Sequence, residues 1–216
     1  MRTIKSYALR EGRISAAQAR ACRELLPKHG ISYRDDTLDF ARVFGRFAPT
    51  VMEIGFGMGE ALAEAAGANP ARDYLGIEVY SPGVGSLLNR IEREGLTNLK
   101  IIQHDAAEVL RNMIGLKTLH GLHVFFPDPW PKKRHHKRRL VNQNFVALAC
   151  DRLAAQGYIH LTTDWQSYAE EMFSLLSAEP RLKRELAKDR PRTKFEIKGE
   201  RAGRKVWDLL FVKAGE

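Results

Sequence analysis

The sequence predicts an α/β fold built on a doubly wound, Rossmann-like sheet of seven strands, mostly parallel, with a C-terminal antiparallel hairpin. From residue 50 onward, short apolar runs alternate with amphipathic segments, which is typical of repeated strand–helix units. A glycine-rich turn at residues 55–59 joins the first apolar run to a helix, as in nucleotide-binding sheets. Near the C-terminus, two β-prone runs flank a short segment that contains Gly199 and Gly203, which predicts the hairpin.

Each element of this fold can be assigned to a stretch of the chain. Strands are expected at residues 50–54, 73–79, 99–103, 119–126 and 157–163. Helices are expected at residues 59–68, from residue 82 onward, and at residues 138–153 and 165–176. Pro82 suits a first helical turn, where no intrahelical partner is needed for its missing N–H. The hairpin is expected to pair residues 194–198 with residues 205–212, after a charged insertion at residues 179–192.

The N-terminal part of the chain lacks this alternation. We expect a basic extension over residues 1–40, followed by a single domain of ordinary size over residues 41–216. A basic helix is predicted at residues 14–26. The residues before it have little apolar surface to bury, so they are expected to be mobile until a partner orders them.

Positive charge is concentrated in two stretches of the sequence. The formal net charge is +9, yet residues 132–139 alone carry six Lys or Arg and no acid, and residues 1–34 carry eight against two acids. Clustered cations favour a polyanionic partner such as nucleic acid. The alternative is a charged surface that only increases solubility.

The cysteine content and the absence of a targeting pattern suggest a cytoplasmic protein. Cys22 and Cys150 are too few for a disulfide framework and lie in no metal-ligand spacing. The sequence has no apolar run of about 18 residues and no signal-peptide pattern, so neither a membrane association nor a secreted location is expected. The neighbouring residues His135 and His136 are poorly spaced for one metal ion, and no metal is expected.

Four carboxylates stand at the ends of four successive predicted strands: Glu53, Glu78, Asp105 and Asp128. Glu78 has the position at which a carboxylate binds ribose hydroxyls in nucleotide-binding sheets. The dinucleotide fingerprint would require a further glycine where this chain has Glu60, which favours a cofactor without a pyrophosphate. Ribose hydroxyls, an adenine amine and a cationic tail, all present in S-adenosylmethionine, would suit these acids. Any one of them could instead cap a helix, and for Asp105 both roles are open.

The chain resembles the bacterial tRNA (guanine-N(7)-)-methyltransferases, which are class I enzymes that use S-adenosylmethionine. The resemblance extends from about residue 50 to the C-terminus. It rests on EIGFGMGE at 53–60, GIEVYSPGV at 76–84, QHDAAEVL at 103–110, FFPDPWPKKRHHKRRLV at 125–141, TDW at 163–165 and TKFE at 193–196. Pro131 departs from the family, where histidine is frequent, and affects only a local polar contact.

The resemblance implies a reaction and a set of site residues. The implied reaction transfers a methyl group from S-adenosylmethionine to nitrogen-7 of the guanine at position 46, in the variable loop of tRNA. Asp128 would be catalytic, and the cofactor would be bound by Glu53, Gly55, Gly57, Glu78, Asp105 and Asp128. The substrate would be bound by Lys132, Arg134, Lys137, Arg138, Arg139, Asp164, Thr193, Lys194, Phe195 and Glu196. The expected partner is tRNA, with no obligate protein partner, and the protein would be a monomer or a homodimer.

Two other functions stay open on the residues alone. A non-catalytic RNA-binding module would explain the cations but not the four acids. A methyl- or aminopropyltransferase for a small molecule would explain the acids but not the cations. Within the site, Asp128 could orient the base, stabilise its developing charge, or do both. Trp130 could stack on the base or support the loop from beneath.

Overall fold

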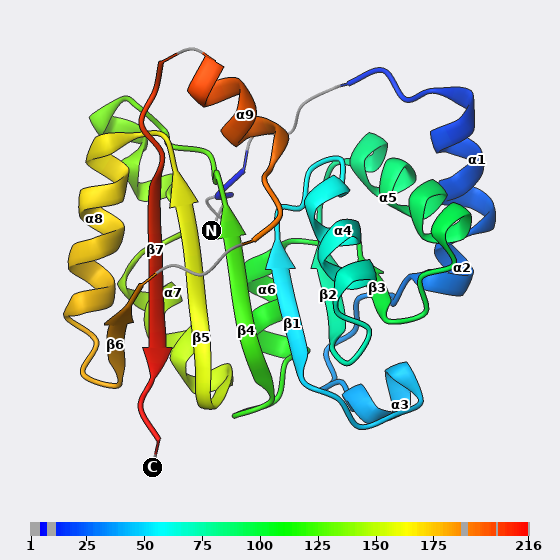
Figure 1. The fold of residues 1–216 in the computed structure, drawn as a ribbon, viewed down its shortest axis with the longest axis horizontal. Coiled ribbons are helices and arrows are strands. Elements are labelled where there is room, and N and C mark those ends of the chain that lie inside the picture. Colours follow the sequence, from blue (N-terminus) through cyan, green and yellow to red (C-terminus); the bar gives the residue numbers. More distant parts are fainter. Residues whose placement is uncertain (1–4, 8–11, 187–189, 202, 216) are drawn as a thin grey trace.

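The computed structural model describes residues 5–7, 12–186, 190–201 and 203–215, and its centre is a seven-stranded sheet (Figure 1). The strand order is β3-β2-β1-β4-β5-β7-β6. The strands are β1 (Thr50–Ile54), β2 (Asp73–Ile77), β3 (Leu99–Ile102), β4 (Leu119–Phe125), β5 (Leu153–Thr163), β6 (Leu182–Glu185) and β7 (Trp207–Lys213). Neighbours from β3 to β5 are parallel, whereas β7 is antiparallel to both β5 and β6. The predicted fold class is confirmed.

Helices cover both faces of this sheet and extend beyond its edge. They are α1 (Ala16–Glu24), α2 (Leu26–His29), α3 (Phe40–Phe44), α4 (Glu60–Ala68), α5 (Ser81–Glu94), α6 (Ala106–Asn112), α7 (Gln143–Arg152), α8 (Gln166–Ser177) and α9 (Lys194–Arg201). A 3-10 helix occupies Lys133–Arg138, where the sequence predicted only a loop, and α7 therefore begins later than expected. Asn142 caps α7 by accepting from the backbone N–H of Phe145 at 3.1 Å.

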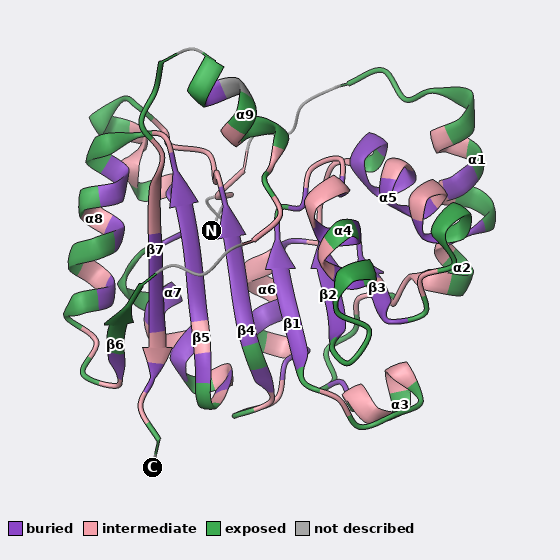
Figure 2. Cartoon of the chain, viewed as in Figure 1, coloured by how far each residue is buried: buried purple, intermediate pink, exposed green. Residues whose placement is uncertain are grey.

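Two apolar clusters pack against opposite faces of the sheet. On one face, Met52 and Leu122 pack with residues of α6, α7 and α8. On the other face, Val51 packs with residues of α4 and α5. Successive side chains of a strand point to opposite faces, so Val51 and Met52 contribute to different clusters. The central strands are therefore buried on both sides, which explains their nearly continuous apolar sequences (Figure 2).

The predicted N-terminal helix is present and packs against the domain. Ser15 and Gln18 form a capping box at the start of α1. Ala21 and Leu25 are buried in the cluster that also contains α5. The expected mobility of the preceding segment concerns mainly residues 1–4 and 8–11, which lie outside the described residues.

The location of the first hairpin strand was predicted wrongly. Residues 194–198 belong to α9, and the strand that pairs with β7 is β6, inside the segment expected to be an insertion. The helix forms because Thr193 and Glu196 make a reciprocal capping arrangement. The backbone N–H of Glu196 donates to Oγ1 of Thr193 at 3.1 Å, and that of Thr193 donates to Oε2 of Glu196 at 3.4 Å.

Candidate active site

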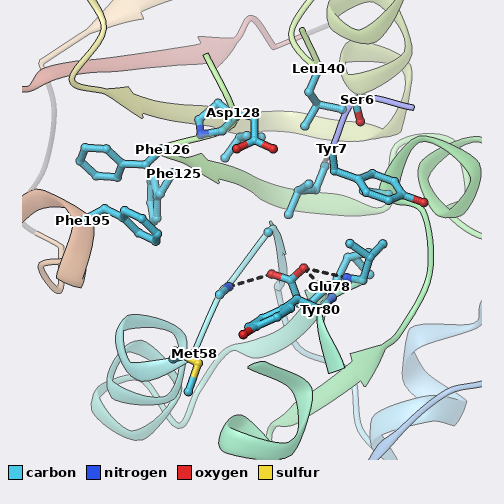
Figure 3. A pocket seen from close by; sticks show the side chains of 18 of the residues that line it. Ser6, Tyr7, Met58, Glu78, Tyr80, Phe125, Phe126, Asp128, Leu140 and Phe195 are labelled. Atoms are coloured by element: carbon cyan, nitrogen blue, oxygen red, sulfur yellow. Dashed lines mark hydrogen bonds between the residues drawn. The ribbon is translucent and has the colours of Figure 1, made fainter. Parts of the chain in front are cut away.

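A cleft of about 710 Å³ opens at the carboxyl ends of β1, β2 and β4 (Figure 3). Ile54, Ile77 and Phe125, the last residues of these strands, all line it. The strand order reverses between β1 and β4, and ligands of doubly wound sheets bind outside the strand ends at this point. The volume lies within the range of roughly 300–1,000 Å³ that is usual for small-molecule sites.

The glycine-rich turn forms one wall of the cleft. Gly55, Gly57 and Gly59 have φ angles of 75°, 58° and 80°, in the left-handed region that other residues rarely adopt. The turn also lies against the first turn of α5, where a Cβ atom on Gly83 would approach the carbonyl oxygen of Gly57 to 2.0 Å. Glycine is therefore required on both sides of this contact, and the exposed backbone of the turn faces the ligand space.

Glu78 is fixed in the cleft by three backbone donors. Its Oε2 accepts from the N–H of Gly57 at 2.9 Å, and its Oε1 accepts from Val79 and Tyr80 at 2.7 Å and 3.0 Å. Burial nevertheless raises the pKa of Glu78, which the three hydrogen bonds only partly oppose, and the charge of Asp128 raises the pKa further. The site therefore holds a carboxylate that is fixed in position and whose charged form is destabilised by its surroundings.

Asp128 lies on the opposite side of the same cleft, facing Glu78 (Figure 3). It belongs to the segment that follows β4, between Phe126 and Trp130, whose φ angles are 52° and 45°. Two non-glycine residues in the left-handed region within five positions indicate backbone strain, which is common at functional sites. The strained turn directs both Phe126 and Asp128 toward the cleft.

Glu53 and Asp105 lie at their predicted strand ends but do not line the cleft. Glu53 is buried beneath it, and its Oε2 lies 3.9 Å from Nδ1 of His123. Burial lowers the pKa of His123, more than the neighbouring carboxylate raises it. Asp105 caps α6 by accepting from Ala107 at 2.9 Å, so the capping role is present, and it also pairs with Lys5 at 3.0 Å. A role in cofactor binding stays a prediction for both acids.

The cationic run begins directly after this strained turn. Lys132, Lys133, Arg134 and Lys137 are exposed. Arg138 is partly buried, with its guanidinium carbon 4.1 Å from the centre of the Trp130 ring. Trp130 in turn donates its indole N–H to the carbonyl oxygen of Ser6 at 3.0 Å. The indole thus supports the loop from beneath, which was one of the two roles left open.

Arg139 is placed differently from its neighbours. It is only 2% exposed, and it donates to the carbonyl oxygen of Pro129 at 3.0 Å. Its guanidinium also pairs with Glu171 and lies 4.6 Å from the centre of the Tyr168 ring. The expectation that Arg139 contacts RNA conflicts with this placement, because its donors are directed into the protein. We assign it to anchoring the loop on α8.

Helix α9 lies over the far end of the cleft. Phe195 lines the cleft, and its ring centre is 6.4 Å from that of Phe126, with the two planes 24° apart. Lys194 forms an ion pair with Glu60 at the start of α4. Asp164, just after β5, pairs with Arg204 at 2.6 Å beneath the same helix, where a Cβ atom on Gly199 would lie 3.6 Å from its carboxylate. Neither Thr193, Glu196 nor Asp164 lines the cleft.

Several lining residues were not anticipated from the sequence. Tyr80 lies two residues after Glu78, and Phe126 lies two residues before Asp128, so their closeness to predicted site residues was a usable signal. Ser6 and Tyr7 of the N-terminal segment also line the cleft. The stretch YALREGRIS, which begins at Tyr7, is similar to the family, but it gave no indication that these residues reach the cleft. Within the described residues, no group of three or more His, Cys, Asp or Glu could hold a metal ion, and no helix has the length and apolarity to cross a membrane.

Comparison with known proteins assigns the chain to a family. Residues 47–209 match the family described as putative methyltransferase. The tRNA (guanine-N(7)-)-methyltransferase of Nitrosospira multiformis is 52% identical, over 98% of this chain and 95% of the relative. That of Thiobacillus denitrificans is 53% identical, over 96% and 94%. The 16S rRNA methyltransferase KamB has a similar structure, with a TM-score of 0.60, 14% identity and coverage of 83% and 95%, which supports the fold alone.

The cleft at the switch point, the acids that line it and these near full-length similarities agree with one another. The chain belongs to the tRNA (guanine-N(7)-)-methyltransferase family.

Proposed function

We propose that this protein transfers a methyl group from S-adenosylmethionine to nitrogen-7 of the guanine at position 46 in the variable loop of tRNA. The observation that carries the proposal is the arrangement of Glu78 and Asp128 on opposite sides of one cleft, with exposed cations directly after Asp128. The relatives are named tRNA (guanine-N(7)-)-methyltransferases, which supports the base and the atom. Position 46 rests on the motif resemblance.

The residues of the cleft fit S-adenosylmethionine. The fixed carboxylate of Glu78 suits the adjacent hydroxyls of a ribose, and the backbone at Gly55 and Gly57 allows the remaining chain of the cofactor to approach closely. Val79, Ala106 and Leu140 provide an apolar wall for a flat ring. We propose that Glu53 and Asp105 contribute to the same site. When bound, the cofactor would supply a methyl group on a sulfonium.

The base chemistry requires positioning more than proton transfer. Nitrogen-7 of neutral guanine has an in-plane lone pair, so its methylation needs no prior deprotonation. Holding this lone pair in line with the methyl group can supply roughly 7–11 kcal/mol. The carboxylate of Asp128 faces the cleft and would stabilise the positive charge that develops on the purine. The strained turn around Asp128 would keep that carboxylate in place as the base enters.

The surface beside Asp128 is suited to the tRNA backbone. The exposed side chains of Lys132, Arg134 and Lys137 would bind phosphates, and Arg138 would add a partly shielded cation above Trp130. Phe195 would contact the face of the base, while Asp164, Thr193, Lys194 and Glu196 would define its edge. A tRNA substrate implies activity in the cytoplasm. We propose that the protein acts on tRNA as a monomer or a homodimer, without another protein as an obligate partner.

Two transcripts of the same tRNA, one with guanosine and one with adenosine at position 46, test the proposed position. Each is incubated with the protein and with S-adenosylmethionine labelled in the methyl group. We expect label in the guanosine transcript and none above background in the adenosine transcript. Equal labelling of the two would contradict position 46 while leaving methylation of tRNA intact. Labelling of neither would contradict the activity itself.

A further inference from the structure

Arg190, which no motif of the sequence singles out, lies buried between α9 and the sheet. Its side chain is 9% exposed. Nη1 donates to Oε2 of Glu196 in the first turn of α9 at 2.8 Å, and Nη2 donates to Oδ2 of Asp208 on β7 at 3.2 Å. One guanidinium therefore connects the helix above the cleft to a strand of the sheet.

The contacts continue from Arg190 toward the reaction site. The other carboxylate oxygen of Asp208 pairs with Nε2 of His160 on β5. The ring of Phe125 contacts both Arg190 and His160. The guanidinium carbon of Arg190 lies 4.8 Å from the ring centre, and the His160 ring is edge-on at 5.3 Å. Phe125 lines the cleft and precedes Asp128 by three residues. The network thus joins α9 to the base of the segment that carries Asp128.

Burial of this guanidinium is costly for stability. A buried cation loses its hydration, and a well-packed apolar side chain is often as stabilising as a buried ion pair. Nε of Arg190 is buried and has no hydrogen-bond partner among the described residues. An arginine at this position is better explained by the geometry of its contacts than by a gain in stability. Its planar fork holds two carboxylates at fixed positions, one on each Nη nitrogen.

The first turn of α9 contains Glu196, the carboxylate whose position this network fixes. Phe195 points into the cleft beside Phe126 (Figure 3). Glu196 does not itself line the cleft, but it follows Phe195 in the first turn of α9. Arg190 and the N–H of Thr193 both contact Oε2 of Glu196. A carboxylate has acceptor capacity on both oxygens, so Glu196 can still accept from a ligand. Guanine presents neighbouring N1–H and N2–H donors on its Watson–Crick edge, whereas adenine presents an acceptor at N1.

We propose that Arg190 is a positioning residue that orients the Glu196 carboxylate toward the Watson–Crick edge of the target guanine. This inference rests on the proposed function. Arg190 does not touch the base; it acts through Glu196 and through the docking of α9 on β7. Its loss would leave the cofactor half of the cleft intact and would weaken the selection and alignment of guanine. A displacement of about 1 Å in such an alignment can reduce the rate roughly 100-fold.

The test compares Arg190→Met with the wild-type protein on two tRNA substrates, one with guanosine and one with inosine at position 46. Inosine keeps nitrogen-7 and N1–H but lacks the N2 amine. For the wild type we expect inosine to lower kcat/KM roughly tenfold, because one hydrogen bond to a charged acceptor is lost. For Arg190→Met we expect kcat/KM on the guanosine substrate to fall by about 100-fold. The ratio between the two substrates should approach one, with unchanged affinity for S-adenosylhomocysteine.

Arg181→Met is the matched control, because Arg181 also pairs with two carboxylates, Glu179 and Asp151, but lies outside the cleft. It should retain the wild-type substrate ratio. If Arg190→Met does not fold, Arg190→Lys gives the same readout, since one ammonium nitrogen cannot reproduce the two separate donor positions of Nη1 and Nη2. A variant that is less stable but keeps the wild-type ratio would overturn the proposal and assign Arg190 a structural role. A wild-type protein inactive on tRNA would instead refute the proposed function.

Discussion

Asp128 and Glu78 are two carboxylates in one cleft whose surroundings suit different tasks. Glu78 is held by three backbone N–H groups, which makes it a fixed acceptor for a ligand with paired hydroxyls. Asp128 is carried on a strained turn at the border between the cleft and the cationic surface. The first position suits a cofactor that remains in place, and the second suits a base that enters with its RNA.

Asp128→Asn should therefore reduce turnover far more than RNA affinity. The substitution keeps the shape of the side chain and removes the negative charge that would oppose the developing cation. We expect single-turnover methylation to slow roughly 100-fold or more, with the Kd for tRNA changed by less than about threefold. Asp36→Asn, which changes an exposed carboxylate outside the cleft, is the control. Normal turnover in Asp128→Asn would exclude Asp128 from the chemistry.

The raised pKa of Glu78 predicts a pH dependence of cofactor binding. A carboxyl whose pKa is raised on folding takes up a proton above its ordinary value of 4.5 as the pH falls. Protonation replaces an acceptor by a donor and should weaken binding to ribose hydroxyls. We expect the Kd of S-adenosylhomocysteine, measured by calorimetry, to rise on acidification before pH 4.5 is reached. A Glu78→Gln variant should bind weakly, without this dependence. A constant Kd in the wild type down to pH 4.5 would contradict the assignment.

The same pKa shift has a consequence for stability. Because the pKa of Glu78 is higher in the folded than in the unfolded protein, its protonation stabilises the fold, and this stabilisation is complete only below the unfolded pKa. It is lost as the pH rises through the folded pKa. Ionised Glu78 thus destabilises the protein by itself, and a ligand that donates hydrogen bonds to the carboxylate would reduce this effect.

Arg139 should matter for stability rather than for RNA binding. Arg139→Ala removes a buried guanidinium from Glu171 and leaves the carbonyl oxygen of Pro129 without its donor. We expect these losses to lower the free energy of unfolding by about 2–4 kcal/mol. The effect is not larger because Glu171 is partly exposed and regains water. Arg134→Ala, at an exposed position, should change it by less than about 0.5 kcal/mol. Urea unfolding measures both, and equal values would contradict the structural role.

The sequence could not distinguish Arg139 from its neighbours. Six cations within eight residues have no apolar residue among them to mark which side is buried. The inward direction of Arg139 depends on α8, whose Tyr168 and Glu171 are distant in sequence. By contrast, the positions of Glu78 and Asp128 follow from the ends of apolar strands, and both could be predicted to meet at one edge of the sheet.

At the scale of elements, the central parallel strands were predictable because burial on both faces makes their sequences predominantly apolar. The strand β6 has three charged residues after Leu182, as expected for an edge strand that resists further pairing, and its sequence therefore resembles an exposed loop. In α9, the apolar residues Phe195 and Ile197 alternate with polar ones and suggested a strand. The capping sequence Thr193–Glu196 was the signal that could have identified the helix.

The contact between α5 and the glycine-rich turn gives an element-scale prediction. In Gly83→Ala, the new Cβ atom would lie 2.0 Å from the carbonyl oxygen of Gly57, so the turn must shift. We expect the Kd of S-adenosylhomocysteine to rise at least about tenfold, because a shift of this size displaces the backbone of the cofactor site. The control is Gly95→Ala at the other end of α5, where φ is 63° and nothing lies within 4 Å.

Gly95→Ala should cost about 1–2 kcal/mol of stability through its left-handed conformation and leave cofactor affinity unchanged. The two variants thus separate general destabilisation of α5 from a local change in the cofactor site. A Gly83→Ala variant with wild-type affinity would show that the turn does not approach the ligand.

At the scale of the whole molecule, the fold places the cofactor cleft and the exposed cations side by side. The cations come from the loop after β4, the strand that forms the centre of the sheet beside β1. A polyanion bound to this loop would therefore lie at the entrance of the cleft. The sequence pattern has two parts, the acids at the strand ends and the cationic run. A reaction on a nucleic acid explains both parts together.

Charge reversal in the exposed run should change the salt dependence of tRNA binding. In the double variant Arg134→Glu with Lys137→Glu, we expect the slope of log Kd against log salt concentration to decrease by roughly 1 for each phosphate that the loop no longer neutralises. Affinity for S-adenosylhomocysteine should not change. Arg42→Glu with Lys183→Glu alters two exposed cations on α3 and β6 and should leave the slope unaltered. Identical slopes for the two double variants would contradict a specific role of the loop.

The most direct measurement of the central claim is the identity of the methylated nucleoside. The wild-type protein is incubated with bulk tRNA and S-adenosylmethionine labelled in the methyl group, and the RNA is then digested to nucleosides and separated. The arrangement of Glu78, Asp128 and the exposed cations around one cleft predicts that the label appears in 7-methylguanosine. Label in another nucleoside, or an unlabelled RNA fraction, would contradict it.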